Sequence, residues 1–360
     1  SLSFAAGPLL RLAKDDRASR DAVLKRMAHH KVSGLGVAVL NDGTLAWARG
    51  YGVLRAGTKT AVTSHSRFQA ASISKPVTAL AALRLVQQGK LSLDQNANEK
   101  LVSWKIPDNE FTRRRPPTLR QLLSHTAGFT VHGFGGYERG AAIPSLVQVL
   151  DGKPPANSAA VRVELLPGTK VQYSGGGYCV VQQLIEDVGG KPFPRLMHEL
   201  VLKRVGMQDS TFEQPLPNEL TAHAATGHDG DGRPLGGSWH VYPEMAAAGL
   251  WTTPADLACY VLALSQAHQR GSSELLAADQ VHAMFTRQMG DADAGLGIFL
   301  GGSGQSLSFS HNGANAGFRC QFIGFPATGQ GAVIMTNSDN GDGLMGELIE
   351  SLRIEYQWPG

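Results

Sequence analysis

The residues best placed for covalent chemistry are Ser72 and Lys75, which lie three positions apart. Pro76 follows them, and an almost wholly apolar run then continues to Gly89. Proline is tolerated in the first turn of a helix and glycine is common just past the last turn, so the sequence predicts a buried helix that begins at these residues. Positions i and i+3 share one helix face. A serine hydroxyl beside an amine at a helix N-terminus can serve as a nucleophile with its base.

Three other stretches place polar residues in settings that suggest a site. Tyr173 precedes Ser174 and three consecutive glycines, where the backbone must bend sharply or approach a neighbour closely. His311 begins a His-Asn-Gly triplet at the end of a β-prone run, which suggests a strand that lines a ligand site. His125 lies in a Ser-His-Thr-Ala-Gly turn that ends a predicted helix over 118–123, and we interpret it as a structural histidine. Taken singly, Tyr173 and His311 are more typical of buried, hydrogen-bonded side chains than of catalytic ones.

Other catalytic and ligand-binding templates are absent from the sequence. It contains no GxSxG, HExxH, GxxxxGK[ST] or GxGxxG motif. The segment 229–232, Asp-Gly-Asp-Gly, lacks the remaining ligands of a calcium loop and is interpreted as a surface turn. The sequence therefore predicts chemistry carried by side chains, with no metal and no cofactor.

Composition and charge exclude several classes of function. The 360 residues carry a formal charge of only +3, so nothing favours a nucleic acid partner, and the arginine run 113–115 is interpreted as a solvated loop. No apolar stretch reaches 18 residues, so no transmembrane segment is predicted. The start of the chain lacks the basic region of a signal peptide, which leaves the compartment open: periplasmic or secreted if a signal was removed, otherwise cytoplasmic. The three cysteines are widely spaced and indicate buried thiols rather than disulfides.

The helices and strands that the sequence predicts around these residues indicate an α+β fold. Asp42-Gly43 joins two β-prone runs into an antiparallel hairpin, and four further β-prone runs and a terminal helix follow residue 295. The stretch between is rich in helices, including one over 254–269 with Thr253 as its cap. We expect one antiparallel sheet built from both chain ends, with the terminal helices on one face and the helical middle on the other.

This arrangement divides the chain into two domains. Residues 1–70 and 295–360 would form the α/β domain that contains the antiparallel sheet. Residues 71–294 would form a mostly helical inserted domain. We expect the active site at the junction of the two, because the candidate residues come from both.

In combination and in this order, the motifs resemble those of the penicillin-recognising serine hydrolases. This superfamily contains class C β-lactamases, D,D-peptidases, D-aminopeptidases and β-lactamase-like carboxylesterases. The motifs are Ser-x-x-Lys at Ser72, Tyr-Ser at Tyr173 and His-x-Gly at His311. Flanking segments such as LLSHTAGF, LLPGTKVQYSGGGY and AAAGLWTTPADLA agree, so the resemblance spans about residues 32–350. It implies a β-lactamase/transpeptidase-like fold and no cofactor.

The resemblance also implies catalytic roles. Ser72 would attack the substrate carbonyl and form an acyl-enzyme. Lys75 and Tyr173 would together remove and return its proton, and the sequence does not separate them as the general base. The oxyanion hole would be formed by the backbone N–H groups of Ser72 and Ala314.

Substrate contacts are implied for His311, Gly313 and Gly175, and two of these depart from the family pattern. Gly175 stands where β-lactamases and peptidases have an asparagine that binds the acylamide side chain of the substrate. His311 replaces the lysine of Lys-Thr-Gly, as in some D,D-peptidases and D-aminopeptidases. A histidine carries only fractional charge near neutral pH, so we expect weaker, pH-dependent binding of a substrate carboxylate. Both changes predict a poor β-lactamase.

The sequence therefore predicts a serine hydrolase for a small ester or amide, most like the β-lactamase-like carboxylesterases and with at most weak β-lactamase activity. The alternative enzyme is a D,D-peptidase, D-aminopeptidase or amidase. A non-catalytic penicillin-binding-like module is a third interpretation, against which the intact Ser72, Lys75 and Tyr173 argue. Natural substrate and oligomeric state stay open. Candidates for the walls of the pocket are Tyr137, Trp239, His240 and Tyr242.

Overall fold

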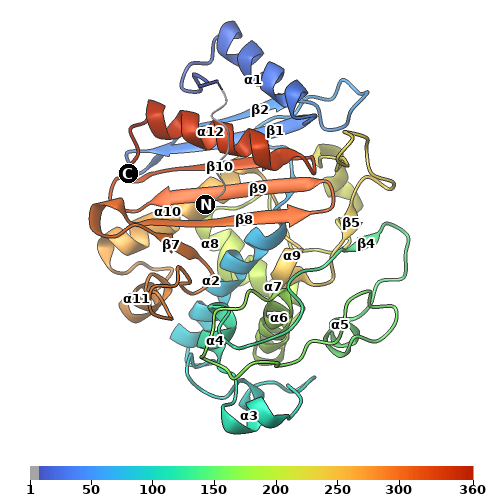
Figure 1. Cartoon of the computed structure of the whole chain (residues 1–360), viewed down its shortest axis with the longest axis vertical. Coiled ribbons are helices and arrows are strands. Elements are labelled where there is room, and N and C mark those ends of the chain that lie inside the picture. The colour runs from blue at the N-terminus through green and yellow to red at the C-terminus, as the bar shows by residue number, and fades with distance from the viewer. Residues whose placement is uncertain (1–7, 360) are drawn as a thin grey trace.

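Short strands from both ends of the chain pair into one antiparallel sheet in the computed structural model, which describes residues 8–359 (Figure 1). Asp42 and Gly43 have positive φ in the turn between the first two strands, as the sequence predicts. Val37 lies opposite Ile334, which joins the N-terminal hairpin to the C-terminal strands. In spatial order, the strands are β2 (Thr44–Gly52), β1 (Gly34–Asn41), β10 (Gln330–Thr336), β9 (Phe318–Phe325), β8 (Ser308–Asn315) and β7 (Phe299–Gly301).

Both faces of the sheet are covered, because successive strand residues point to opposite sides. Val37 belongs to the core under α1 (Arg17–His29) and α12 (Gly341–Glu355). Its neighbour Ala38 belongs to the larger core on the other side, where α10 (Pro254–Arg270) packs on the sheet. The expected α+β fold, with the terminal helices on one face and the helical middle on the other, is confirmed.

The middle of the chain is mostly helical, and its longest helices are α2 (Ser74–Gln87), α6 (Gly175–Gly189) and α10. Two short sheets pair β3 (Phe68–Gln69) with β6 (Trp251–Thr252) and β4 (Tyr137–Glu138) with β5 (His240–Val241). The shorter helices are η1 (Ala71–Ile73), η2 (Ala97–Glu99), α3 (Glu110–Arg114), α4 (Leu119–Leu123), α5 (Leu146–Asp151), α7 (Phe193–Met197), η3 (His198–Leu202), α8 (Lys203–Val205), η4 (Asn218–His223), α9 (Met245–Ala248), α11 (Ala278–Met284) and η5 (Gly304–Ser306).

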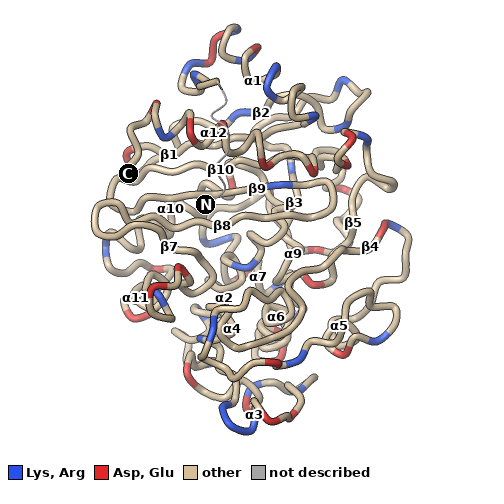
Figure 2. The backbone as a smooth tube through the Cα atoms, viewed as in Figure 1, with Lys and Arg blue, Asp and Glu red and all other residues tan. Residues whose placement is uncertain are grey.

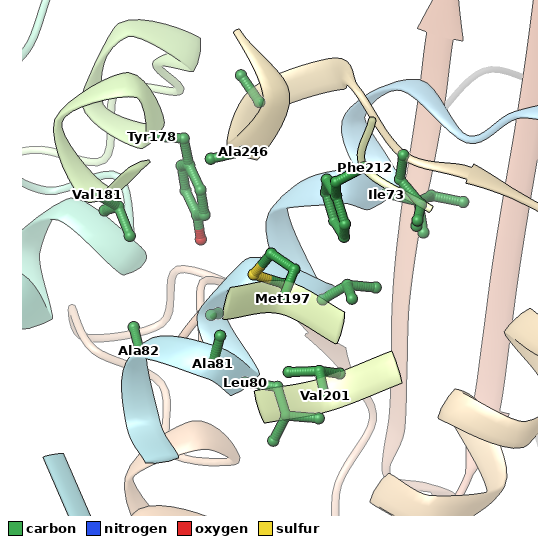
Figure 3. Packing of buried hydrophobic residues seen from close by; sticks show 14 of the residues in the cluster. Ile73, Leu80, Ala81, Ala82, Tyr178, Val181, Met197, Val201, Phe212 and Ala246 are labelled. Atoms are coloured by element: carbon green, nitrogen blue, oxygen red, sulfur yellow. The ribbon is translucent and has the colours of Figure 1, made fainter. Parts of the chain in front are cut away.

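Helix α2 is buried on nearly every side, and every residue from Ser74 to Leu85 is inaccessible to solvent or nearly so. Figure 3 shows its small residues Ala81 and Ala82 close to side chains of other helices, which include Tyr178 and Met197. Alanines on a helix surface leave room for larger neighbours, so α2 can lie at the centre of the helical part.

The helix begins later than the sequence predicts. Ser72 lies in the preceding turn η1 and not in α2, while Lys75 is in the first turn of α2. Ala71 has a φ of 50°, which no right-handed helix accommodates, so the chain changes direction just before Ser72. The nucleophile candidate therefore lies in the short turn η1, immediately before α2.

Charged residues of both signs are interspersed along the backbone in the view of Figure 2. The arginine run 113–115 is exposed, as expected, but its first two residues belong to the last turn of α3 rather than to a loop. Within residues 8–359, no helix has the length and apolar character needed to cross a bilayer. The first seven residues, which include the start that the sequence distinguishes from a signal peptide, lie outside the described part of the chain, as does residue 360.

Candidate active site

Ser72 and Lys75 meet in a cavity of about 740 Å³ that is lined by both the sheet and the helical part. Lys75 Nζ donates a hydrogen bond to Ser72 Oγ at 3.0 Å and a second one to the Ala247 carbonyl of α9 at 2.9 Å. The lysine is buried, and both acceptors are uncharged oxygens. A direct contact of this length lets an amine exchange a proton with the serine hydroxyl.

The turn that carries Ser72 is hydrogen-bonded to a neighbouring segment around Leu250. Ser74 Oγ donates to the Ala71 carbonyl at 2.6 Å and accepts from the Leu250 N–H at 2.9 Å. The Ala70 N–H donates to the Leu250 carbonyl at 2.8 Å. A non-glycine residue with positive φ costs about 1–2 kcal/mol, so these bonds hold Ala71 in a conformation that it would not adopt alone.

Strand β8 lies directly against this turn, because Gly313 has no side chain. A Cβ atom at position 313 would come within 2.3 Å of the Ala70 carbonyl oxygen and 3.1 Å of the Ala71 Cβ. The next residue, Ala314, lines the cavity together with Ser72. The two residues whose N–H groups are the expected oxyanion donors therefore border the same space.

Tyr173 is held beside the Ser72–Lys75 pair by His125. The Gln172 N–H donates to the His125 carbonyl at 2.7 Å, and the Ser174 N–H donates to His125 Nδ1 at 3.2 Å. The two aromatic rings are 4.3 Å apart between centroids. Lys75 Nζ lies 4.9 Å from the centroid of the Tyr173 ring. The hydrogen bonds of its two chain neighbours, Gln172 and Ser174, to His125 thus fix the backbone of Tyr173.

His125 is neutral in this position. Burial, and secondarily the positive charge of Lys75, lowers its pKa well below the usual 6.5. Because Nδ1 accepts a hydrogen bond, the ring proton is on Nε2. The interpretation of His125 as structural is incomplete, since its contacts position Tyr173. Its φ of 58° in the Ser-His-Thr-Ala-Gly turn is the local feature that places the ring there.

His311 is also neutral, which corrects the expectation of fractional charge. Burial, with a smaller contribution from Lys75, lowers its pKa to about 3. Nδ1 donates to the Asn312 carbonyl at 2.6 Å, so Nε2 carries a lone pair. This Nε2 is buried and has no partner among residues 8–359. At neutral pH His311 therefore offers a hydrogen-bond acceptor to the cavity and cannot attract a carboxylate by charge.

Gly175, a predicted substrate contact, is buried and does not line the cavity, although it lies close to a residue that does. A Cβ atom built at position 175 would lie 3.0 Å from Phe134 Cε2 and 3.1 Å from the His132 carbonyl oxygen. The aromatic candidates for the pocket walls do not line it either. Asn312, the middle residue of the predicted His-Asn-Gly triplet, lines it, and lining residues that sequence reasoning did not name are His132, Gly133, Phe134, Ala247, Ala248, Phe299, Ser310, Asn315 and Asp342.

No group of three or more His, Cys, Asp and Glu side chains with a metal-binding arrangement occurs in residues 8–359. The segment 229–232 is a surface turn in which Asp229 accepts from the N–H groups of Asp231 and Arg233. Cys179 and Cys320 are buried free thiols, and Cys259 is a half-buried free thiol.

Glu244 is a buried carboxyl group next to α9, the helix that accepts the hydrogen bond of Lys75. Burial raises its pKa from 4.5 to about 7. Neither carboxyl oxygen has a partner in hydrogen-bond geometry among residues 8–359. Below about pH 7, the neutral acid is therefore the form that the folded protein favours.

We expect the stability of the protein to fall between pH 4.5 and pH 7 through this group. Over that range the unfolded chain releases the Glu244 proton while the folded chain retains it, so a rising pH favours unfolding. The displacement of the pKa corresponds to about 3 kcal/mol. Glu244→Gln removes the titrating group. In urea unfolding, the free energy of unfolding of this variant minus that of wild type should therefore rise by about that amount between pH 4.5 and pH 8.

The exposed neighbour Glu138 provides a control, because Glu138→Gln removes a carboxyl group that is accessible to water. The difference in free energy of unfolding between Glu138→Gln and wild type should be the same at pH 4.5 and at pH 8. A difference for Glu244→Gln that also stays constant with pH would show that Glu244 is ionised in the folded protein.

Comparison with known proteins agrees with the motifs and the geometry. The protein-family model described as Beta-lactamase matches residues 20–354. Penicillin-binding protein 4 of Amycolatopsis lactamdurans is 27% identical over 345 residues, which cover 91% of this chain and 86% of that protein.

Two solved structures show the same fold. A penicillin-binding protein homologue from Pyrococcus abyssi, described as octameric, aligns with a TM-score of 0.76 at 22% identity over 95% of this chain and 78% of that one. A β-lactamase/D-alanine carboxypeptidase from Yersinia pestis aligns with a TM-score of 0.68 at 19% identity over 94% of this chain and 100% of that one. With the family match over nearly its whole length, the chain belongs to the beta-lactamase family of penicillin-recognising serine hydrolases.

Proposed function

We propose that the protein is a serine hydrolase that cleaves small carboxylic esters through an acyl-enzyme on Ser72, with at most weak β-lactamase activity. The observation that carries this proposal is the 3.0 Å contact from Lys75 Nζ to Ser72 Oγ. It occurs in a cavity that Tyr173 and Ala314 also line, so the residues proposed as nucleophile, base and oxyanion donor adjoin one substrate-sized space.

In the proposed reaction, these residues act in the following order. Ser72 Oγ bonds to the ester carbonyl carbon while its proton passes to Lys75 or Tyr173. The carbonyl oxygen, now negative, is stabilised by the N–H groups of Ser72 and Ala314, and each such donor contributes about 3–4 kcal/mol. The tetrahedral intermediate then expels the alcohol, which takes up the proton. Water attacks the acyl-enzyme by the same route in reverse and releases the acid.

An uncharged ester suits this cavity better than an anionic substrate. β-Lactams and peptides that end in D-alanine carry a carboxylate. Among the described lining residues there is no arginine, and Lys75 is the only lysine, with two hydrogen bonds already made. His311 is neutral and presents an acceptor, which repels a carboxylate oxygen. The rival function is that of a D-peptidase or amidase, and a comparison of ester, β-lactam and peptide substrates tests both.

A substrate panel checks the choice. We expect kcat/KM for p-nitrophenyl butyrate to exceed that for nitrocefin and for a D-alanyl-D-alanine peptide by about a hundredfold or more, since loss of an ionic contact and of an amide partner each cost about 1–3 kcal/mol. Ser72→Ala should abolish all three activities. Faster turnover of the peptide than of the ester would contradict the proposal and favour the rival.

Removal of the Tyr173 hydroxyl tests its place in proton transfer. We expect Tyr173→Phe to lower kcat for the ester by about a hundredfold, the usual range for loss of a general acid or base, with little change in KM. Tyr356→Phe is the matched control, because Tyr356 follows α12 and bonds to Trp47 rather than to the cavity. A Tyr173→Phe variant with near wild-type kcat would assign the base to Lys75 alone.

A further inference from the structure

Phe134 occupies the space that a side chain at position 175 would need. Its Cε2 and Cδ2 atoms lie 3.0 and 3.4 Å from the place of a Cβ at Gly175. The ring is half-buried and lines the cavity. Phe134 therefore places an apolar aromatic ring beside Gly175 of α6 and at the wall of the cavity.

The loop that carries Phe134 is held from behind by the 240–242 segment. The Tyr242 hydroxyl donates to the Gly135 carbonyl at 3.3 Å and accepts from the Ala316 N–H at 3.0 Å. His240 Nδ1 lies 2.9 Å from the same Gly135 oxygen. Ala316 directly follows β8, so one buried phenol connects the Phe134 loop to the strand that carries Ala314.

The loop can approach Tyr242 this closely because its residue 136 is glycine. A Cβ at Gly136 would lie 2.5 Å from the Tyr242 Cζ, and the φ of 69° at this position suits glycine. The pairing of β4 with β5 adds a second connection immediately after the loop. Phe134 is thus a fixed wall of the cavity, not a side chain on a free loop.

We propose that Phe134 determines acyl-chain specificity: its ring limits the cavity on the side of Gly175 to short apolar acyl groups, and Tyr242 is the residue that positions it. The proposal rests on the proposed ester hydrolysis at Ser72. Phe134 is assigned to the acyl side of the substrate because Gly175 stands where related enzymes have the asparagine that binds the acylamide side chain. The packing of the Phe134 ring beside Gly175 narrows the cavity on that side.

Acyl-chain profiles test the proposal. With p-nitrophenyl esters from acetate to octanoate, wild type should prefer the short chains. Phe134→Ala should raise the ratio of kcat/KM for octanoate to that for acetate at least roughly tenfold, because each methylene accommodated in an apolar pocket changes the rate severalfold. Phe134→Leu should give a smaller shift in the same direction. Ile143→Ala, a control at an exposed position nine residues further along the chain, should leave the profile unchanged.

The positioning role of Tyr242 has its own readout. Tyr242→Phe should shift the acyl-chain profile in the same direction as Phe134→Ala, and the double variant should shift it no further than Phe134→Ala alone. Additive shifts would show that Tyr242 acts elsewhere. An unchanged profile for Phe134→Ala, in a variant whose thermal unfolding matches wild type, would overturn the proposal.

A second measurement separates this proposal from the proposed function. Labelling of Ser72 by fluorophosphonates with short and long alkyl chains requires the nucleophile but no turnover of an ester. Phe134→Ala should speed labelling by the long-chain probe relative to the short-chain probe about tenfold. If ester turnover is absent but this shift occurs, the proposed function fails and the role of Phe134 stands; if labelling shows no shift, the role of Phe134 fails.

Discussion

The site depends on the two hydrogen bonds that the buried amine of Lys75 donates. It bonds to Ser72 in the preceding turn η1 and to the Ala247 carbonyl of α9, a segment more than 170 residues further along the chain. Gln182 of α6 holds that segment in turn, because its side-chain amide bonds to the Pro243 carbonyl and the Ala246 N–H. Helix α6 begins just after Tyr173. One lysine therefore links Ser72, the proposed nucleophile, to the elements that hold Tyr173, the second candidate for proton transfer.

The sheet contributes a constraint of a different kind, which is steric. Gly313 lets β8 approach the backbone of Ala70 so closely that no side chain fits between them. This approach brings Ala314 to the cavity that Ser72 lines, and the strand pairing of Gly313 with Cys320 fixes it in register. The candidate active site thus lies where a strand from the C-terminal end meets a turn from the N-terminal third of the chain.

Local signals in the sequence predicted the elements well. Asp42-Gly43 adopts the expected turn, and Thr253 caps α10 through the Asp256 N–H. The order of the motifs also anticipated that Ser72, Lys75, Tyr173, His311 and Ala314 line one cavity. These features depend on residue type and short spacing, which a sequence displays directly.

The remaining features depend on burial and on contacts between distant segments. Residue type alone suggests a partly charged His311, but desolvation next to Lys75 keeps it neutral. The place of Phe134 depends on a glycine at position 175 and on Tyr242, both far from it in sequence. The turn η1, which carries Ser72 ahead of α2, starts at Ala71 with a positive φ, and hydrogen bonds to the distant residue Leu250 hold this turn in place. None of these has a local signature in the chain.

The central claim is that Ser72 forms a covalent acyl-enzyme, and its direct test is the mass of the protein during turnover. Rapid acid quenching after mixing with p-nitrophenyl butyrate, followed by intact-protein and peptide mass spectrometry, should show one butyryl group on the peptide that contains Ser72. The adduct should be absent in Ser72→Ala. Ester turnover with no adduct in wild type, or an adduct that persists in Ser72→Ala, would contradict the account.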